Sequence, residues 1–129
     1  MASLFTRIVS GEIPCYKIAE NEKFLAFLDI FPLVKGHTLV ISKLETDYLF
    51  DLNDEDLSEI LVFSKEIANK IEKIIPCKRI GISVIGLEVP HAHVHLVPIN
   101  SADDLNFTRP KLTVSTEEMS VIAEKIRNA

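Results

Sequence analysis

The segment Val89-Pro90-His91-Ala92-His93-Val94-His95-Leu96-Val97 carries three of the chain's four histidines at alternating positions. Side chains two residues apart share a face of a β-strand, so this pattern predicts a strand with His91, His93 and His95 on one surface. Apolar residues would occupy the other surface. Burying these imidazoles for packing alone would require a partner for both nitrogens of every ring. The alternation therefore predicts a functional site on a strand.

The composition is that of one folded domain. The chain has 129 residues, of which 47% are apolar and 26% charged, enough to form a core as a single domain over residues 1–129. The net charge of −5 and the scattered basic residues argue against a basic face that binds nucleic acid. Cys15 and Cys77 are isolated, so neither a disulfide framework nor a cysteine zinc cage is predicted.

No segment suggests contact with a membrane. No apolar run approaches the ~20 residues that span a bilayer, and the first residues lack the apolar stretch of a signal peptide. A cytoplasmic location is therefore expected.

Hydrophobic periodicity and turn residues predict the elements around the histidine strand. Helices are expected from Leu4 to Val9, from an N-cap at Asn53 to Pro76, and from a capping box at Ser115 to Arg127. Strands are expected at residues 16–19, 24–28, 38–41, 79–85 and 91–97. This order predicts an α+β fold in which an antiparallel meander of about five strands carries one long helix and short terminal helices. The sheet face that carries the histidines would be open.

The chain resembles the histidine triad (HIT) family at two separated places. The alternating histidines from residue 91 to 97 match the family signature, and residues 11–14, 25–30 and 36–41 with Pro32 match its upstream half. Two motifs in the family's order, spread over about four-fifths of the chain, are far more specific than one short pattern. The resemblance implies a HIT-like fold and a homodimer that buries part of the long helix.

The resemblance also implies an activity. HIT proteins of this kind are nucleotide hydrolases or transferases that cleave at the α-phosphorus of purine nucleoside phosphoramidates, dinucleoside polyphosphates or similar esters. His93 would be the nucleophile that forms a nucleotidyl-histidine intermediate, since neutral imidazole is available near pH 7. His37, His91 and His95 would surround the phosphate and donate hydrogen bonds to it. No metal or cofactor is implied.

The nucleotide would be of the AMP type, as substrate or product. Asp29 matches the residue that accepts hydrogen bonds from the ribose hydroxyls, a role suited to an ionised carboxylate. Glu88 and Val89, just before the triad, are assigned to the same site. The positions that match the base pocket are apolar: Leu4, Phe5, Ile8, Phe27 and Ile30.

The chain departs from the family before the triad. Where the family commonly has Gly-Gln followed by Ser or Thr, this chain has Gly86, Leu87 and Glu88. A carboxylate about 5 Å from the phosphate would cost roughly 3 kcal/mol at an effective dielectric near 20. Glu88 is therefore expected to point away; the alternatives are that it is protonated or assists a basic leaving group. The family's amide would fall near Ile80, where the chain has no amide; Ser83 could substitute after a small shift of the loop.

Other interpretations remain open from the residues alone. Three imidazoles on one face could hold Zn²⁺ in a metal-dependent hydrolase. The chain could also be a nucleotide-binding scaffold without catalysis. Asp29 could simply begin a turn, and Phe5, Ile8 and Phe27 could be core residues.

Overall fold

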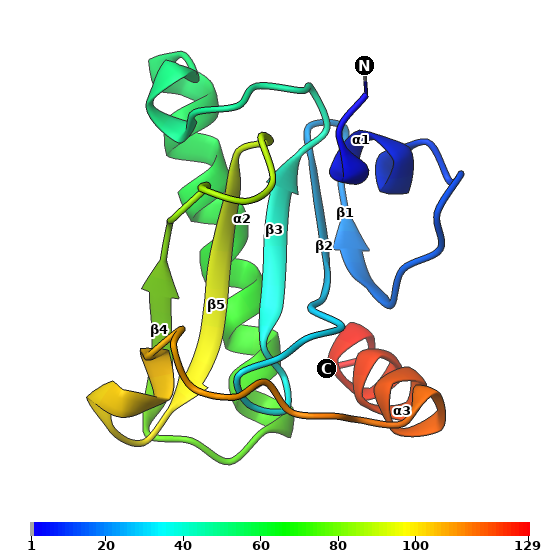
Figure 1. Cartoon of the computed structure of the whole chain (residues 1–129), viewed down its shortest axis with the longest axis vertical. Helices are drawn as coiled ribbons and strands as arrows, with labels where there is room; N and C mark the ends of the chain where they lie inside the picture. The colour runs from blue at the N-terminus through cyan, green and yellow to red at the C-terminus, as the bar shows by residue number, and fades with distance from the viewer. Residues whose placement is uncertain (1) are drawn as a thin grey trace.

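The protein, described here over residues 2–129 by a computed structural model, has the predicted α+β architecture (Figure 1). The helices are α1 (Leu4–Val9), α2 (Asp54–Ile74) and α3 (Thr116–Arg127). The strands are β1 (Lys17–Glu20), β2 (Phe24–Leu28), β3 (Thr38–Ser42), β4 (Arg79–Ser83) and β5 (His93–Ile99). Two short 3-10 helices were not predicted: η1 (Leu49–Asp51) and η2 (Ala102–Leu105).

The helix ends follow from side-chain caps. The Asn53 carboxamide accepts a hydrogen bond from the Asp56 N–H at 2.7 Å, and the Ser115 hydroxyl accepts one from the Glu118 N–H at 3.1 Å. Both bonds satisfy amides that lack a partner inside the helix, which confirms the predicted starts of α2 and α3.

All five strands form one antiparallel sheet in the order β1-β2-β3-β5-β4. The register of the two central strands places Ile41 opposite His93 and Leu39 opposite His95. β5 begins two residues later than predicted, because the Ala92 N–H bonds to the Thr46 carbonyl before regular pairing starts. β4 ends before the loop through Gly86 that leads to the histidines.

The sheet is covered on both faces. α2 and α3 bury one face in the larger core, which includes Ala26, Val40 and Val94 from alternate strand positions. The opposite face carries a smaller cluster in which α1 contributes Phe5. The histidine face is therefore only partly open, which differs from the expected arrangement. Figure 1 shows α2 behind the sheet, and the segment between η2 and α3 crossing the ends of β5 and β3.

Among residues 2–129, no helix is long and apolar enough to cross a membrane. The cytoplasmic location stays a prediction.

Gly36 has a backbone conformation and a packing position that only glycine suits. Its φ is 92°, and an added Cβ would lie 2.9 Å from Ile75 Cγ1 and 3.3 Å from Pro98 Cγ. We expect Gly36→Ala to lower the free energy of unfolding by about 2 kcal/mol, measured by urea denaturation. Gly11→Ala is the matched control, because Gly11 has φ 84° but nothing within 4 Å; it should cost about 1 kcal/mol. Equal losses would contradict the packing contribution.

Candidate active site

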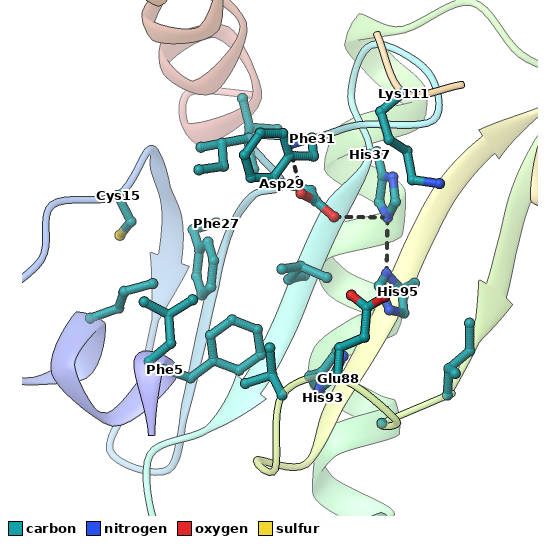
Figure 2. A pocket seen from close by; sticks show the side chains of 18 of the residues that line it. Phe5, Cys15, Phe27, Asp29, Phe31, His37, Glu88, His93, His95 and Lys111 are labelled. Carbon is teal, nitrogen blue, oxygen red and sulfur yellow. Dashed lines mark hydrogen bonds and ion pairs between the residues drawn. The ribbon is translucent and has the colours of Figure 1, made fainter. Parts of the chain in front are cut away.

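A cavity of about 430 Å³ opens on the histidine face between α1, β2, β3, β5 and the loop before the triad (Figure 2). Every residue predicted for the site lines this cavity except His91. The predicted residues that line it are Leu4, Phe5, Ile8, Phe27, Asp29, Ile30, His37, Glu88, Val89, His93 and His95. The fold therefore brings predicted residues from four parts of the chain together in one cavity.

His93 is held in one tautomer by the backbone. Its Nδ1 lies 2.6 Å from the His91 carbonyl oxygen, which can only accept, so Nδ1 carries the proton. Nε2 then bears the lone pair and is the nitrogen available to a ligand. Burial is the main cause that lowers the pKa of His93, against the opposing effect of this hydrogen bond. The ring is therefore a neutral imidazole whose Nε2 is unprotonated.

His37 and His95 form a directed pair. The Leu33 N–H donates to His37 Nδ1 at 3.0 Å, which places the His37 proton on Nε2. That nitrogen lies 3.0 Å from His95 Nδ1, so the His95 proton is on its own Nε2. His95 can thus donate a hydrogen bond from Nε2.

Both imidazoles of this pair are neutral. Burial, followed by His95 and the charge of Lys111, lowers the pKa of His37 to about 3. Burial, followed by His93 and the charge of Lys111, lowers the pKa of His95 to about 4. Asp29 Oδ2 lies 3.6 Å from His37 Nε2, but neutral His37 makes this a polar contact and not an ion pair.

His91 lies beneath the site and does not face the cavity. Its side chain is 0% exposed; Nε2 is 2.5 Å from the Ser42 carbonyl, and Nδ1 accepts from the Ser3 hydroxyl at 2.8 Å. Both ring nitrogens are thus used, so the predicted hydrogen bond from His91 to a phosphate does not fit this geometry. The cause is the late start of β5, which leaves His91 before the strand. His91 instead positions His93 through its carbonyl.

The same geometry bears on the metal alternative. An ion held by all three triad imidazoles would need a free nitrogen on His91, and Ser3 and Ser42 occupy both. A different group, Asp29, His37 and His95, offers ligand atoms within 4.8 Å of one another. A metal ion there would replace the proton shared by the two imidazoles.

A polar network that was not predicted holds α1 against the site. The backbone N–H of Ser3 and the hydroxyl of Thr6 both donate to Glu45 Oε1 at 2.6 Å. The bond from Thr6 is the largest cause that lowers the pKa of Glu45 to about 2. Because Ser3 also bonds to His91, this network connects the start of α1 to the histidine strand. A serine and a glutamate 42 residues apart carry no sequence pattern that would indicate the contact.

The predicted base pocket is both core and cavity wall. Phe5 and Phe27 are buried, with ring centroids 5.8 Å apart in an edge-to-face arrangement, yet both line the cavity. Leu4 and Ile30 are exposed at its rim. An apolar slot of this kind suits a planar base.

Asp29 begins a turn and also lines the cavity. Its Oδ1 accepts a hydrogen bond from the Phe31 N–H at 2.8 Å, which starts the turn after β2. Burial is the main cause that raises its pKa, opposed by that bond and by the Lys111 charge. The carboxylate also lines the cavity, and Figure 2 shows it between Phe27 and His37.

Glu88 does not point away from the histidines as expected. It lines the cavity, and Figure 2 shows its carboxylate extending over the site on the side of His95. The residue is exposed, so the carboxylate stays hydrated at the cavity mouth and avoids the cost of burial. Ser83, the substitute considered for the family amide, pairs with His95 across β4 and β5.

Two further lining residues come from the segment after η2 and were not predicted. The Phe107 ring packs edge-to-face on His95, with centroids 4.8 Å apart, and Lys111 lies beside it. This segment has no hydrophobic periodicity that would place it against the sheet.

The buried neutral pair predicts a dependence of stability on pH. The pKa of His37 falls from 6.5 to about 3, so the unfolded chain binds more protons between these values and stability drops as pH falls below 6.5. We expect urea denaturation to show that the wild-type protein loses about 2 kcal/mol more than His37→Gln between pH 7 and pH 5. Parallel losses in the two proteins would contradict a neutral His37.

Comparison with known proteins identifies the family of this chain. The model of the HIT domain matches residues 10–102. An adenosine 5′-monophosphoramidase of Schizosaccharomyces pombe is 36% identical, over 98% of this chain and 96% of its own. An uncharacterised HIT-like protein of Borreliella burgdorferi is 34% identical, over 95% and 94% of the two chains.

Solved structures have the same fold. The crystal structure of a zinc-bound histidine triad family protein from Mycobacterium smegmatis superposes with a TM-score of 0.84 at 30% identity, covering 99% of this chain and 94% of the other. The family model matches most of the chain and the fold agrees, so the chain belongs to the histidine triad family.

Proposed function

We propose that this protein is a hydrolase that cleaves purine nucleoside phosphoramidates and related nucleotidyl compounds at the α-phosphorus. The observation that carries the proposal is the tautomer of His93, whose Nδ1–H is bonded to the His91 carbonyl and whose Nε2 is left for a substrate. The similar S. pombe protein is named an adenosine 5′-monophosphoramidase, which supports an AMP-type nucleotide.

The cavity suits such a nucleotide from one end to the other. The base would lie in the slot at Phe5 and Phe27, and the ribose hydroxyls would donate to Asp29. The phosphate would then lie at His93 and His95. His95 has its Nε2 proton available to a phosphate oxygen, because His37 occupies the Nδ1 side.

The reaction follows in two steps. His93 Nε2 attacks the phosphorus while the bond to the leaving nitrogen breaks, and that nitrogen takes up a proton from water at the cavity mouth and departs as an amine. Water then attacks the phosphorus of the nucleotidyl-histidine, the P–N bond to His93 breaks, and the proton that this water loses passes to solvent as the nucleoside monophosphate leaves and the imidazole becomes neutral again. Donors such as His95 stabilise the charge that develops on the phosphate oxygens, an effect typically worth about 10²–10³ in rate.

The test is a single-turnover reaction with an adenosine phosphoramidate in excess chelator, followed by intact mass. We expect a nucleotidyl adduct that forms and decays in the wild-type protein. His93→Asn should form no adduct and lose at least about 10³-fold in turnover, while its affinity for AMP stays within a few-fold. Turnover that chelator abolishes would instead indicate a metal-dependent hydrolase. AMP binding without turnover in the wild-type protein would indicate a binding module.

We also propose that the protein is a homodimer. Three large apolar residues are exposed on α2 and on the edge strand β4: Leu61 at 49%, Val62 at 59% and Ile82 at 51%. An edge strand beside an apolar helix surface is suited to pairing with a second copy.

This proposal predicts a change of oligomeric state. The double variant Leu61→Glu, Val62→Glu should sediment as a monomer, because charge on an apolar interface opposes association. Val121→Glu is the matched control: Val121 is 48% exposed on α3, away from the proposed interface, and this variant should remain a dimer. A wild-type monomer, or a dimer in the double variant, would contradict the proposal.

A further inference from the structure

The segment from residue 106 to 112, which we term the strap, reaches the active site from beyond the part of the chain that the family model matches. The Leu112 N–H donates to the Pro32 carbonyl at 2.8 Å, which fixes the strap to the loop between Asp29 and His37. Phe107 packs on His95, and its ring centroid is 6.0 Å from that of His37. The strap therefore forms one wall of the cavity.

Lys111 is the one lysine or arginine among the described residues that line this cavity. Its Nζ donates to the Phe107 carbonyl at 2.6 Å and the Arg109 carbonyl at 3.3 Å, and lies 5.8 Å from the Phe107 ring centroid. An ammonium has three donors, so these two carbonyls leave one for a ligand.

Lys111 also differs from Arg109 in its ion pairs, although its charge reaches the Asp29 carboxylate. Arg109, in the same strap, pairs with Asp103 and Asp104, whereas no carboxylate within residues 2–129 lies in ion-pair distance of Lys111. A charged group that lacks a counter-ion and faces a cavity is suited to an anionic ligand.

The position of Lys111 indicates which part of a substrate it meets. Figure 2 shows its ammonium on the side of His37 opposite Asp29. With the ribose at Asp29 and the phosphorus at His93 and His95, Lys111 lies beyond the phosphate, where the leaving group extends. Glu88 lies at the same cavity and repels anions, which leaves the strap side as the place for a negative group.

We propose that Lys111 makes the site selective for leaving groups that carry an anionic oxygen group, a carboxylate or a phosphate. The proposal rests on the proposed hydrolase function, and it assigns the strap to leaving-group recognition. The charge of Lys111 is the third cause, after burial and a neighbouring imidazole, that lowers the pKa values of His37 and His95. This agrees with an electrostatic field of Lys111 that extends to the position assigned to the phosphate.

The test uses two adenosine phosphoramidates that differ in one group, with β-alanine or β-alaninamide as the leaving amine. We expect the wild-type protein to favour the carboxylate substrate in kcat/KM by roughly tenfold, as a single charge pair near a surface can provide. Lys111→Met should reduce this ratio to about 1, and Lys111→Arg should retain it. Lys125→Met, a lysine on α3, is the control that should keep both activity and ratio.

A second arm identifies the anion. Diadenosine triphosphate has ADP as its leaving group, which departs through an anionic phosphate; loss of its hydrolysis in Lys111→Met, with no change in the carboxylate ratio, would support recognition of phosphate only. An unchanged response to both anions would overturn the proposal. An equal loss on the acid and the amide would also overturn it, because that result indicates that Lys111 only holds the strap or contacts the α-phosphate.

Binding measured without turnover separates this proposal from the proposed function. On the His93→Asn background, calorimetry of the same two compounds should show the same Lys111-dependent preference in Kd. If the wild-type protein hydrolyses neither compound but this preference persists, the hydrolase function fails and anion recognition stands. If the protein hydrolyses both without preference, recognition by Lys111 fails alone.

Discussion

The site depends on one hydrogen bond, from His93 Nδ1–H to the His91 carbonyl. This bond leaves the lone pair of His93 on Nε2, where a ligand can contact it. The His91 carbonyl can accept the bond because the backbone at His91 lies before the start of β5. His91 is held there by Ser42 from β3 and by Ser3 at the start of α1. The orientation of a single imidazole is thus determined by three segments that are distant in the chain.

The sheet provides the rigidity that this arrangement requires. β2 and β3 are buried along their whole length, with alternate residues packed against α2 on one face and around Phe5 on the other. Because the second cluster pairs in register with His93 and His95, the apolar wall and the histidines cannot shift independently. Binding an apolar base and positioning a phosphate therefore use the same packed layer.

Sequence periodicity predicted the order of the main elements, and family resemblance predicted half of the residues that line the cavity, since both depend on local patterns. Neither could show that the His91 side chain turns inward. The alternating pattern assumes a strand that begins at residue 91, whereas the hydrogen bond from the Ala92 N–H to the Thr46 carbonyl delays the start of β5. The orientation of Glu88 depends on loop geometry, for which charge repulsion alone was a poor guide. Phe107 and Lys111 were missed because an aperiodic segment is placed by long-range contacts such as Leu112 to Pro32.

The chain of hydrogen bonds from Leu33 through His37 to His95 ends, on the side of the core, at a backbone N–H donor. A backbone amide can donate to His37 Nδ1 but does not take up a proton, so no acceptor continues the chain toward the core. Protons that reach or leave this pair of imidazoles must pass through the cavity mouth, which a bound nucleotide would cover. A bound nucleotide would therefore slow the exchange of protons between this pair of imidazoles and bulk water.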